Sequence, residues 1–168
     1  MHPFSLAQVA GYFSFLLGVS AFLQRTDRRL KSFNASQSLV YALHFGLLGN
    51  LPAAAASLIS SVRSFLALRF RSVTLAAAII VVYAGAGLML AKTPAGWLTV
   101  VASSAATLAM FTLNGVPLRL VLLGCTFAWL ANNILSRSIG GVLLESTIVA
   151  VNASTIIRML QTTNEPVD

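Results

Sequence analysis

Apolar residues dominate this chain from end to end, and no segment is polar enough to form the surface of a water-soluble domain. Of its 168 residues, 57% are hydrophobic and only 9% are charged, whereas a soluble domain carries about 25% charged residues. Mean hydropathy is +0.84. A helix crosses the hydrocarbon core with about 20 residues, so the chain has room for about seven or eight crossings. The sequence therefore predicts a single polytopic α-helical membrane domain over residues 1–160.

Seven apolar segments follow one another along the chain. They cover residues 4–23, 36–49, 51–68, 73–91, 96–113, 117–133 and 139–159. Pro52 suits the first turn of a helix, where a missing N–H costs nothing, and this favours two separate crossings for the second and third segments. A single re-entrant hairpin is the alternative for that pair. Residues 161–168 are polar, and we expect a disordered tail there.

The basic residues indicate which ends of the helices face the cytoplasm. Cytoplasmic loops carry an excess of Lys and Arg. With seven crossings and the N-terminus outside, Lys92 and Arg137 fall in outer loops and Arg63 falls inside the third helix. The cytoplasmic loops and tail then hold the other basic residues: Arg25, Arg28, Arg29, Lys31, Arg69, Arg71, Arg119 and Arg158. This asymmetry predicts an outside N-terminus and a cytoplasmic C-terminus. It also accounts for the net charge of +7 without nucleic-acid binding.

Weak internal similarity suggests two three-helix repeats joined by one helix. Repeat one covers about residues 4–69, the linker helix about 73–91 and repeat two about 96–159. Arg29-Leu30 in the first half corresponds to Arg119-Leu120 in the second, and Ser60 falls where Asn152 lies. The offsets drift between about 88 and 92 residues. A three-plus-one-plus-three plan gives both triplets one orientation, related by an axis along the membrane normal.

Three ionisable side chains lie inside the apolar segments: His44, Arg63 and Glu145. Such groups cost about 2.5–3.5 kcal/mol each on insertion scales, so they favour a functional site. From a rise of about 1.5 Å per residue, His44 and Glu145 share a layer about 8–9 Å below the outer helix ends. Arg63 and Asn152 share a deeper layer, at about 18–20 Å. Arg63 could instead snorkel to the inner surface.

Two polar stripes follow the third and seventh helices. Serines repeat at i, i+3, i+4 and i+7 in the third helix, and Glu145, Asn152 and Thr155 share a face of the seventh. Because polar stripes avoid lipid, we expect both to face a shared interior. Packing of small residues between helices is the alternative for the serine stripe alone. The serines are Ser57, Ser60, Ser61 and Ser64.

No motif of a known enzyme class occurs, so we expect no catalytic activity and no cofactor. Two histidines and one cysteine do not make a usual metal site. Cys125 lies in an apolar run and is expected to be a packing residue. Trp97 and Trp129 are expected to be interface aromatics.

Several motifs together resemble the YgjV-type bacterial inner-membrane proteins over about residues 6–159. The first half contributes the run 24–31, His44-Phe45-x-Leu47-Leu48-Gly49, Pro52-Ala53 and Arg63; the second half contributes Ser138-Ile139-Gly140-Gly141, Glu145, Asn152 and Ile156-Ile157-Arg158. The resemblance implies a bacterial inner-membrane location and no particular activity. Family members can have His where this chain has Asn132, so a symmetric pair with His44 is not available here.

The expected architecture also resembles that of SWEET-type sugar transporters, PQ-loop proteins and the nicotinamide riboside carriers. In the SWEET type, asparagines on the third helix of each triplet line the substrate site, a position that Asn152 would fill. No Pro-Gln dipeptide occurs in this chain, which departs from the PQ-loop pattern.

The sequence thus favours a small-solute transporter with a polar or anionic substrate. The expected substrate-binding residues are Ser60, Arg63, Glu145 and Asn152, with His44 near the outer gate and Asn132 near the outer end of the sixth helix. A non-transporting membrane interaction subunit is the alternative. The lipid bilayer is an expected partner, a homo-oligomer is compatible with the sequence, and no substrate is indicated.

Overall fold

The computed structural model describes residues 6–47, 51–91, 94–135 and 139–163. Within these ranges the side chains of 8, 51–53, 95–96, 132–133, 135, 139–141 and 162–163 are not described. Seven helices occupy the described residues: α1 (Leu6–Leu23), α2 (Asp27–Leu47), α3 (Leu51–Arg69), α4 (Val73–Leu90), α5 (Pro94–Thr112), α6 (Gly115–Leu135) and α7 (Ile139–Thr163). The expected all-α fold and the seven expected segments are therefore both present.

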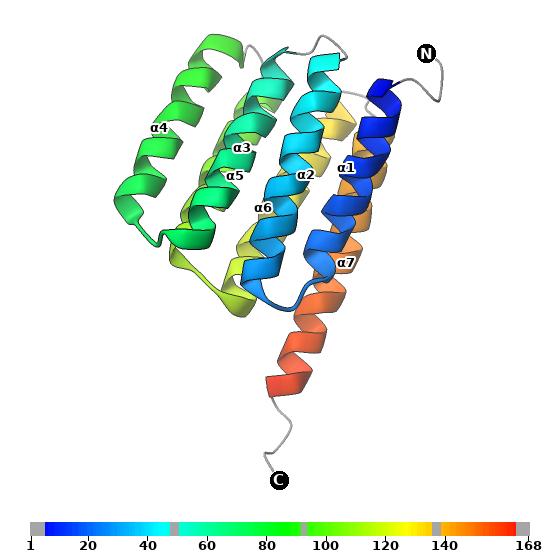
Figure 1. The fold of residues 1–168 in the computed structure, drawn as a ribbon, viewed down its shortest axis with the longest axis vertical. Helices are drawn as coiled ribbons and strands as arrows, with labels where there is room; N and C mark the ends of the chain where they lie inside the picture. The colour runs from blue at the N-terminus through cyan, green and yellow to red at the C-terminus, as the bar shows by residue number, and fades with distance from the viewer. Residues whose placement is uncertain (1–5, 48–50, 92–93, 136–138, 164–168) are drawn as a thin grey trace.

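The helices form two facing rows (Figure 1). α2 packs between α1 and α3, and α6 packs between α5 and α7. The rows meet where α1 contacts α7 and α3 contacts α5, while α4 packs against α3 and α5 at one edge. The C-terminal part of α7 projects beyond the other helices, on the side where the chain turns from α1 to α2.

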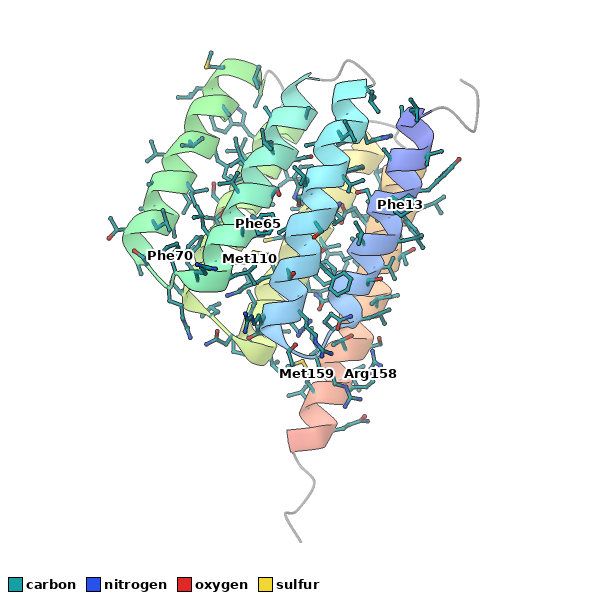
Figure 2. All side chains as sticks on the ribbon, viewed as in Figure 1. Phe13, Phe65, Phe70, Met110, Arg158 and Met159 are labelled. Carbon is teal, nitrogen blue, oxygen red and sulfur yellow. The ribbon has the colours of Figure 1, made fainter. Side chains whose placement is uncertain are left out.

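Apolar side chains cover the outside of the bundle (Figure 2). Phe13 is 61% exposed, and Val81 on α4 is 69% exposed. α4 (Val73–Leu90) and the Val142–Gln161 part of α7 are long and apolar enough to cross a membrane, and α1, α5 and α6 contain shorter apolar stretches. An exterior of this kind is matched by lipid rather than by water.

The largest difference from the sequence prediction is the start of α2. The second apolar segment begins at residue 36, yet α2 begins at Asp27 and includes most of the basic run. α7 likewise continues to Thr163, so the first residues of the expected tail are helical. Hydropathy does not detect either extension because the added turns are polar.

Two basic residues that we placed in cytoplasmic loops are buried inside the bundle. Lys31 lies in the first turns of α2 with 5% exposure, and Arg119 lies in α6 with 0%. Lys31 Nζ donates to the carbonyl oxygens of Met110 at 2.6 Å and Ala67 at 3.4 Å. These carbonyls belong to the last turns of α5 and α3, where the helix dipole favours a cation.

Candidate functional site

A central cavity of about 380 Å³ lies between the two rows of helices. Its volume falls within the range of about 300–1,000 Å³ that is typical of small-molecule sites. α1, α2 and α3 line one side, and α5, α6 and α7 line the other. The lining residues are Gly18, Phe22, Asn34, Gln37, Ser38, Tyr41, Phe45, Ala56, Ser57, Ser60, Arg63, Ser103, Ala106, Met110, Leu122, Cys125, Thr126, Trp129, Leu144, Glu145 and Ile148.

Arg63 lines the cavity from α3 and does not snorkel to the surface. Its side chain is buried, and Nη1 donates to the Ser103 carbonyl at 3.2 Å and to Thr107 Oγ1 at 3.4 Å. Nε is buried and has no hydrogen-bond partner. Among the described residues, no carboxylate forms an ion pair with Arg63. The hydrogen bonds of the guanidinium therefore go to neutral oxygen atoms of α5.

Glu145 faces the same cavity from α7, on the opposite side from Arg63. It is half-buried, and Tyr41 lines the cavity with it. Within the described part of the chain, no side chain forms an ion pair with Glu145 and no donor bonds to it. Among the described residues, Glu145 therefore does not pair with Arg63.

The four serines of the α3 stripe lie in two different environments. Ser57 and Ser60 line the cavity, and Ser60 Oγ lies 2.6 Å from the Tyr83 hydroxyl of α4. Ser61 and Ser64 instead face α2: Ser61 Oγ donates to the Ala35 carbonyl at 2.9 Å, and Asn34 Nδ2 donates to Ser64 Oγ at 2.8 Å. The stripe thus consists of two residues that line the cavity and two that pack against α2.

Three other candidate residues lie away from the cavity lining or outside the description. Asn152 is fully buried, and its Nδ2 donates to the Arg119 carbonyl at 3.1 Å. His44 lies on the contact between α2 and α1, with Nδ1 2.7 Å from the Ala7 carbonyl oxygen. The Asn132 side chain is among those not described. The cavity therefore brings together Ser60, Arg63 and Glu145 of the predicted set.

The sequence prediction missed the polar stripe of α2. Once α2 is extended to Asp27, Asn34, Gln37, Ser38 and Tyr41 fall at i, i+3, i+4 and i+7 and share a face, and all four line the cavity. This spacing was visible in the sequence, but the late predicted start of the helix concealed it. Trp129 also lines the cavity and is not simply an interface aromatic. Cys125 lines it too, while its Sγ donates to the Ala102 carbonyl at 3.1 Å as a packing residue would.

Polar contacts close the bundle on the side of the α1–α2 turn. Asp27 Oδ2 accepts from the Gly115 N–H at 2.7 Å, and Asp27 Oδ1 lies 3.9 Å from Arg119 Nη2. Thr155 Oγ1 donates to the Phe22 carbonyl at 2.8 Å. These bonds join α2 to α6 and α1 to α7, as the Lys31 bond joins α2 to α5. We call this set, with Lys31, the closing layer.

A helical bundle with an apolar exterior, a closed end and a central cavity beside an Arg and a Glu defines a polytopic α-helical membrane protein. The chain belongs to the Imp-YgjV family, described as a bacterial inner membrane protein, whose model matches residues 5–163. It is 33% identical over 168 residues to the inner membrane protein YgjV of Escherichia coli strain K12, covering 100% of this chain and 92% of that protein. No solved structure matches the chain. The family places the protein in the bacterial inner membrane.

Proposed function

We propose that the protein is a small-solute permease of the inner membrane, built from two three-helix units around the central cavity. The observation that carries the proposal is the constant spacing between cavity-lining residues of the two halves. A cavity lined in the same register by both halves is the arrangement that alternating-access transporters use at their substrate site.

The helix boundaries support two repeated units. α1, α2 and α3 begin at Leu6, Asp27 and Leu51, and α5, α6 and α7 begin at Pro94, Gly115 and Ile139. Of these starts, Asp27 and Gly115 lie within continuously described residues, and they are 88 residues apart.

The cavity lining keeps this register on all three pairs of helices. Of the twenty-one lining residues above, eighteen form nine pairs with the same separation of 88. The pairs are Gly18 and Ala106, Phe22 and Met110, Asn34 and Leu122, Gln37 and Cys125, Ser38 and Thr126, Tyr41 and Trp129, Ala56 and Leu144, Ser57 and Glu145, and Ser60 and Ile148. With a separation of 88 residues, Asn152 corresponds to Ser64. The drifting sequence offsets had instead matched Asn152 with Ser60.

The position of the closing layer favours alternating access. Hydrogen bonds that join the two units lie between mid-bundle, at Arg63 and Ser103, and the end at Asp27 and Gly115. Rocking of one unit against the other would break this layer and open the cavity on that side. The structure would then correspond to the state that is closed at the α1–α2 end.

We assign that closed end to the cytoplasm. Arg25, Arg28, Arg29, Arg69 and Arg71 are exposed there, as the positive-inside rule requires of cytoplasmic loops. Seven crossings then place the N-terminus outside and the C-terminus inside. Reporters fused after Gln8 and after Asp168 should report opposite sides of the membrane, and reports from the same side would exclude this topology.

A non-transporting interaction subunit is supported less well. In such a protein the buried charges would hold helices together, and Arg63 and Glu145 would pair across a filled interior. The described residues contain the cavity and lack that pair.

Obstruction of the cavity tests the proposal. Ser57 lines the cavity, whereas its neighbour Leu58 is 49% exposed on the outside of the bundle. Purified wild type, Ser57→Trp and Leu58→Trp are reconstituted into liposomes, and uptake from a mixture of metabolites is measured by mass spectrometry. We expect wild type and Leu58→Trp to accumulate the same solute. The uptake rate of Ser57→Trp for that solute should be at least tenfold lower than that of wild type. Uptake by none of the three, or equal uptake by all of them, would contradict the permease.

A further inference from the structure

The cavity holds one guanidinium and one carboxyl group that face it from different units. Arg63 comes from α3 and Glu145 from α7, and no ion pair joins either of them to a described residue. The guanidinium also keeps a buried Nε without an acceptor. A buried guanidinium without an opposite charge is costly, and a ligand cation beside a buried carboxyl group favours its ionised form. Both groups therefore favour a ligand that supplies the opposite charges.

The two charges lie at different levels of the cavity. α3 and α7 start at the same end of the bundle, at Leu51 and Ile139. With a rise of about 1.5 Å per residue, Glu145 lies about 9 Å and Arg63 about 18 Å from those starts. A ligand that satisfies both groups therefore carries its own two charges apart, with the cationic group nearer Glu145.

The two walls of the cavity differ in polarity. At three paired positions the first unit supplies Asn34, Gln37 and Tyr41, where the second unit supplies Leu122, Cys125 and Trp129. These three residues of α6 thus form an apolar part of the second wall with one large aromatic ring. Such a wall favours an apolar portion of the ligand, because apolar contact removes both surfaces from water.

We infer that the solute recognised by this cavity is a small zwitterion with an apolar side group, held by its ammonium at Glu145 and by its carboxylate at Arg63. The inference rests on the proposed permease and specifies its substrate class. With Glu145 ionised beside the ammonium of the solute, the charges of the two protein groups sum to zero, as do those of the solute, so the occupied cavity carries no uncompensated charge.

Charge-matched probes test this assignment by equilibrium binding to purified protein in detergent. Phenylalanine carries both charges, 3-phenylpropanoate lacks the ammonium and 2-phenylethylamine lacks the carboxylate. Leucine, 4-methylpentanoate and 3-methylbutylamine form a second series with a smaller apolar group. We expect at least one of the two zwitterions to bind at least tenfold more tightly than both of its singly charged analogues.

Glu145→Gln is the matched variant, because it keeps the shape of the side chain and removes only the acceptor charge. It should weaken zwitterion binding at least tenfold and leave the carboxylate-only analogue unchanged. Arg63→Gln should weaken the zwitterion and the carboxylate-only probe and spare the amine. Arg63→Met, which is also uncharged, serves in its place if Arg63→Gln does not fold.

Equal binding of a zwitterion and its analogues, or no effect of Glu145→Gln, would overturn the inference. Failure of all the zwitterions, while Ser57→Trp still blocks uptake of another solute, would overturn the zwitterion class and leave the permease standing. If no zwitterion binds and Ser57→Trp blocks uptake of no solute, both the permease and its zwitterionic substrate class would be overturned.

Discussion

At the scale of single residues, the most unusual feature is the burial of basic side chains with few partners. Arg119 is fully buried, yet Nε, Nη1 and Nη2 have no hydrogen-bond partner among the described residues. Its ion-pair partner is Asp27 at 3.9 Å, and that carboxylate is 21% exposed. The Asp27 carboxylate therefore forms an ion pair with Arg119 and also accepts a hydrogen bond from the first N–H of α6, that of Gly115.

We predict that neutralising Asp27 is more harmful than neutralising Arg119. Asp27→Asn keeps an acceptor for the Gly115 N–H but leaves a buried guanidinium uncompensated, which costs about 3–5 kcal/mol. Arg119→Met removes the charge and keeps the side-chain length, so it should be nearly neutral. The double variant should recover most of the stability lost by Asp27→Asn, as measured by thermal unfolding in detergent. Equal destabilisation by the two single variants would show that Arg119 itself is favourably bound.

At the scale of helices, the sequence predicted most boundaries because Pro, Gly and Asn mark them and hydropathy follows the apolar spans. The late start assigned to the second helix has a physical cause. Lys31 has a charged side chain, which predicts a loop position. In the structure it is buried within α2, because carbonyl oxygens at the C-terminal ends of α3 and α5 accept hydrogen bonds from its ammonium. Those acceptors lie 36 and 79 residues away in the chain, and no local pattern predicts such contacts.

Gly87 sets the close approach of α4 to α5, and this gives a prediction at the same scale. A Cβ at Gly87 would lie 2.9 Å from Val100 Cγ2, whereas a Cβ at Gly85 on the same helix would meet nothing within 4 Å. Gly87→Ala should therefore destabilise by about 1–3 kcal/mol through overpacking. Gly85→Ala should be neutral or slightly stabilising.

Relief of the clash provides the control. Adding Val100→Ala to Gly87→Ala should recover part of the loss in the thermal unfolding midpoint, because it removes both methyl groups nearest the new Cβ. A Gly87→Ala variant as stable as Gly85→Ala would mean that α4 is free to move away from α5.

At the scale of the whole molecule, the candidate site is assembled by the relation between the two halves. Hydrophobic periodicity predicted that α3 and α7 carry polar faces, and Ser60, Arg63 and Glu145 do line one cavity. It did not predict that Asn152 lies in a packed layer, because the weak sequence identities shifted the offset between the halves. The proposed repeat rests instead on the separation of 88 residues in the cavity lining, which depends on three-dimensional packing.

The central claim is that paired positions of the two units enclose a wet cavity, and cysteine labelling tests it most directly. In a Cys125→Ala background, single cysteines replace the half-buried cavity pair Ser57 and Glu145 and the fully buried pair Ser64 and Asn152. Val81, 69% exposed on α4, is the lipid-facing control. A thiol ionises and reacts with a small charged reagent only where water reaches it.

We expect fast reaction at both members of the cavity pair and slow reaction at both members of the buried pair and at Val81→Cys. Labelling of Ser57→Cys and Glu145→Cys no faster than that of Val81→Cys would show a dry interior and would contradict the permease.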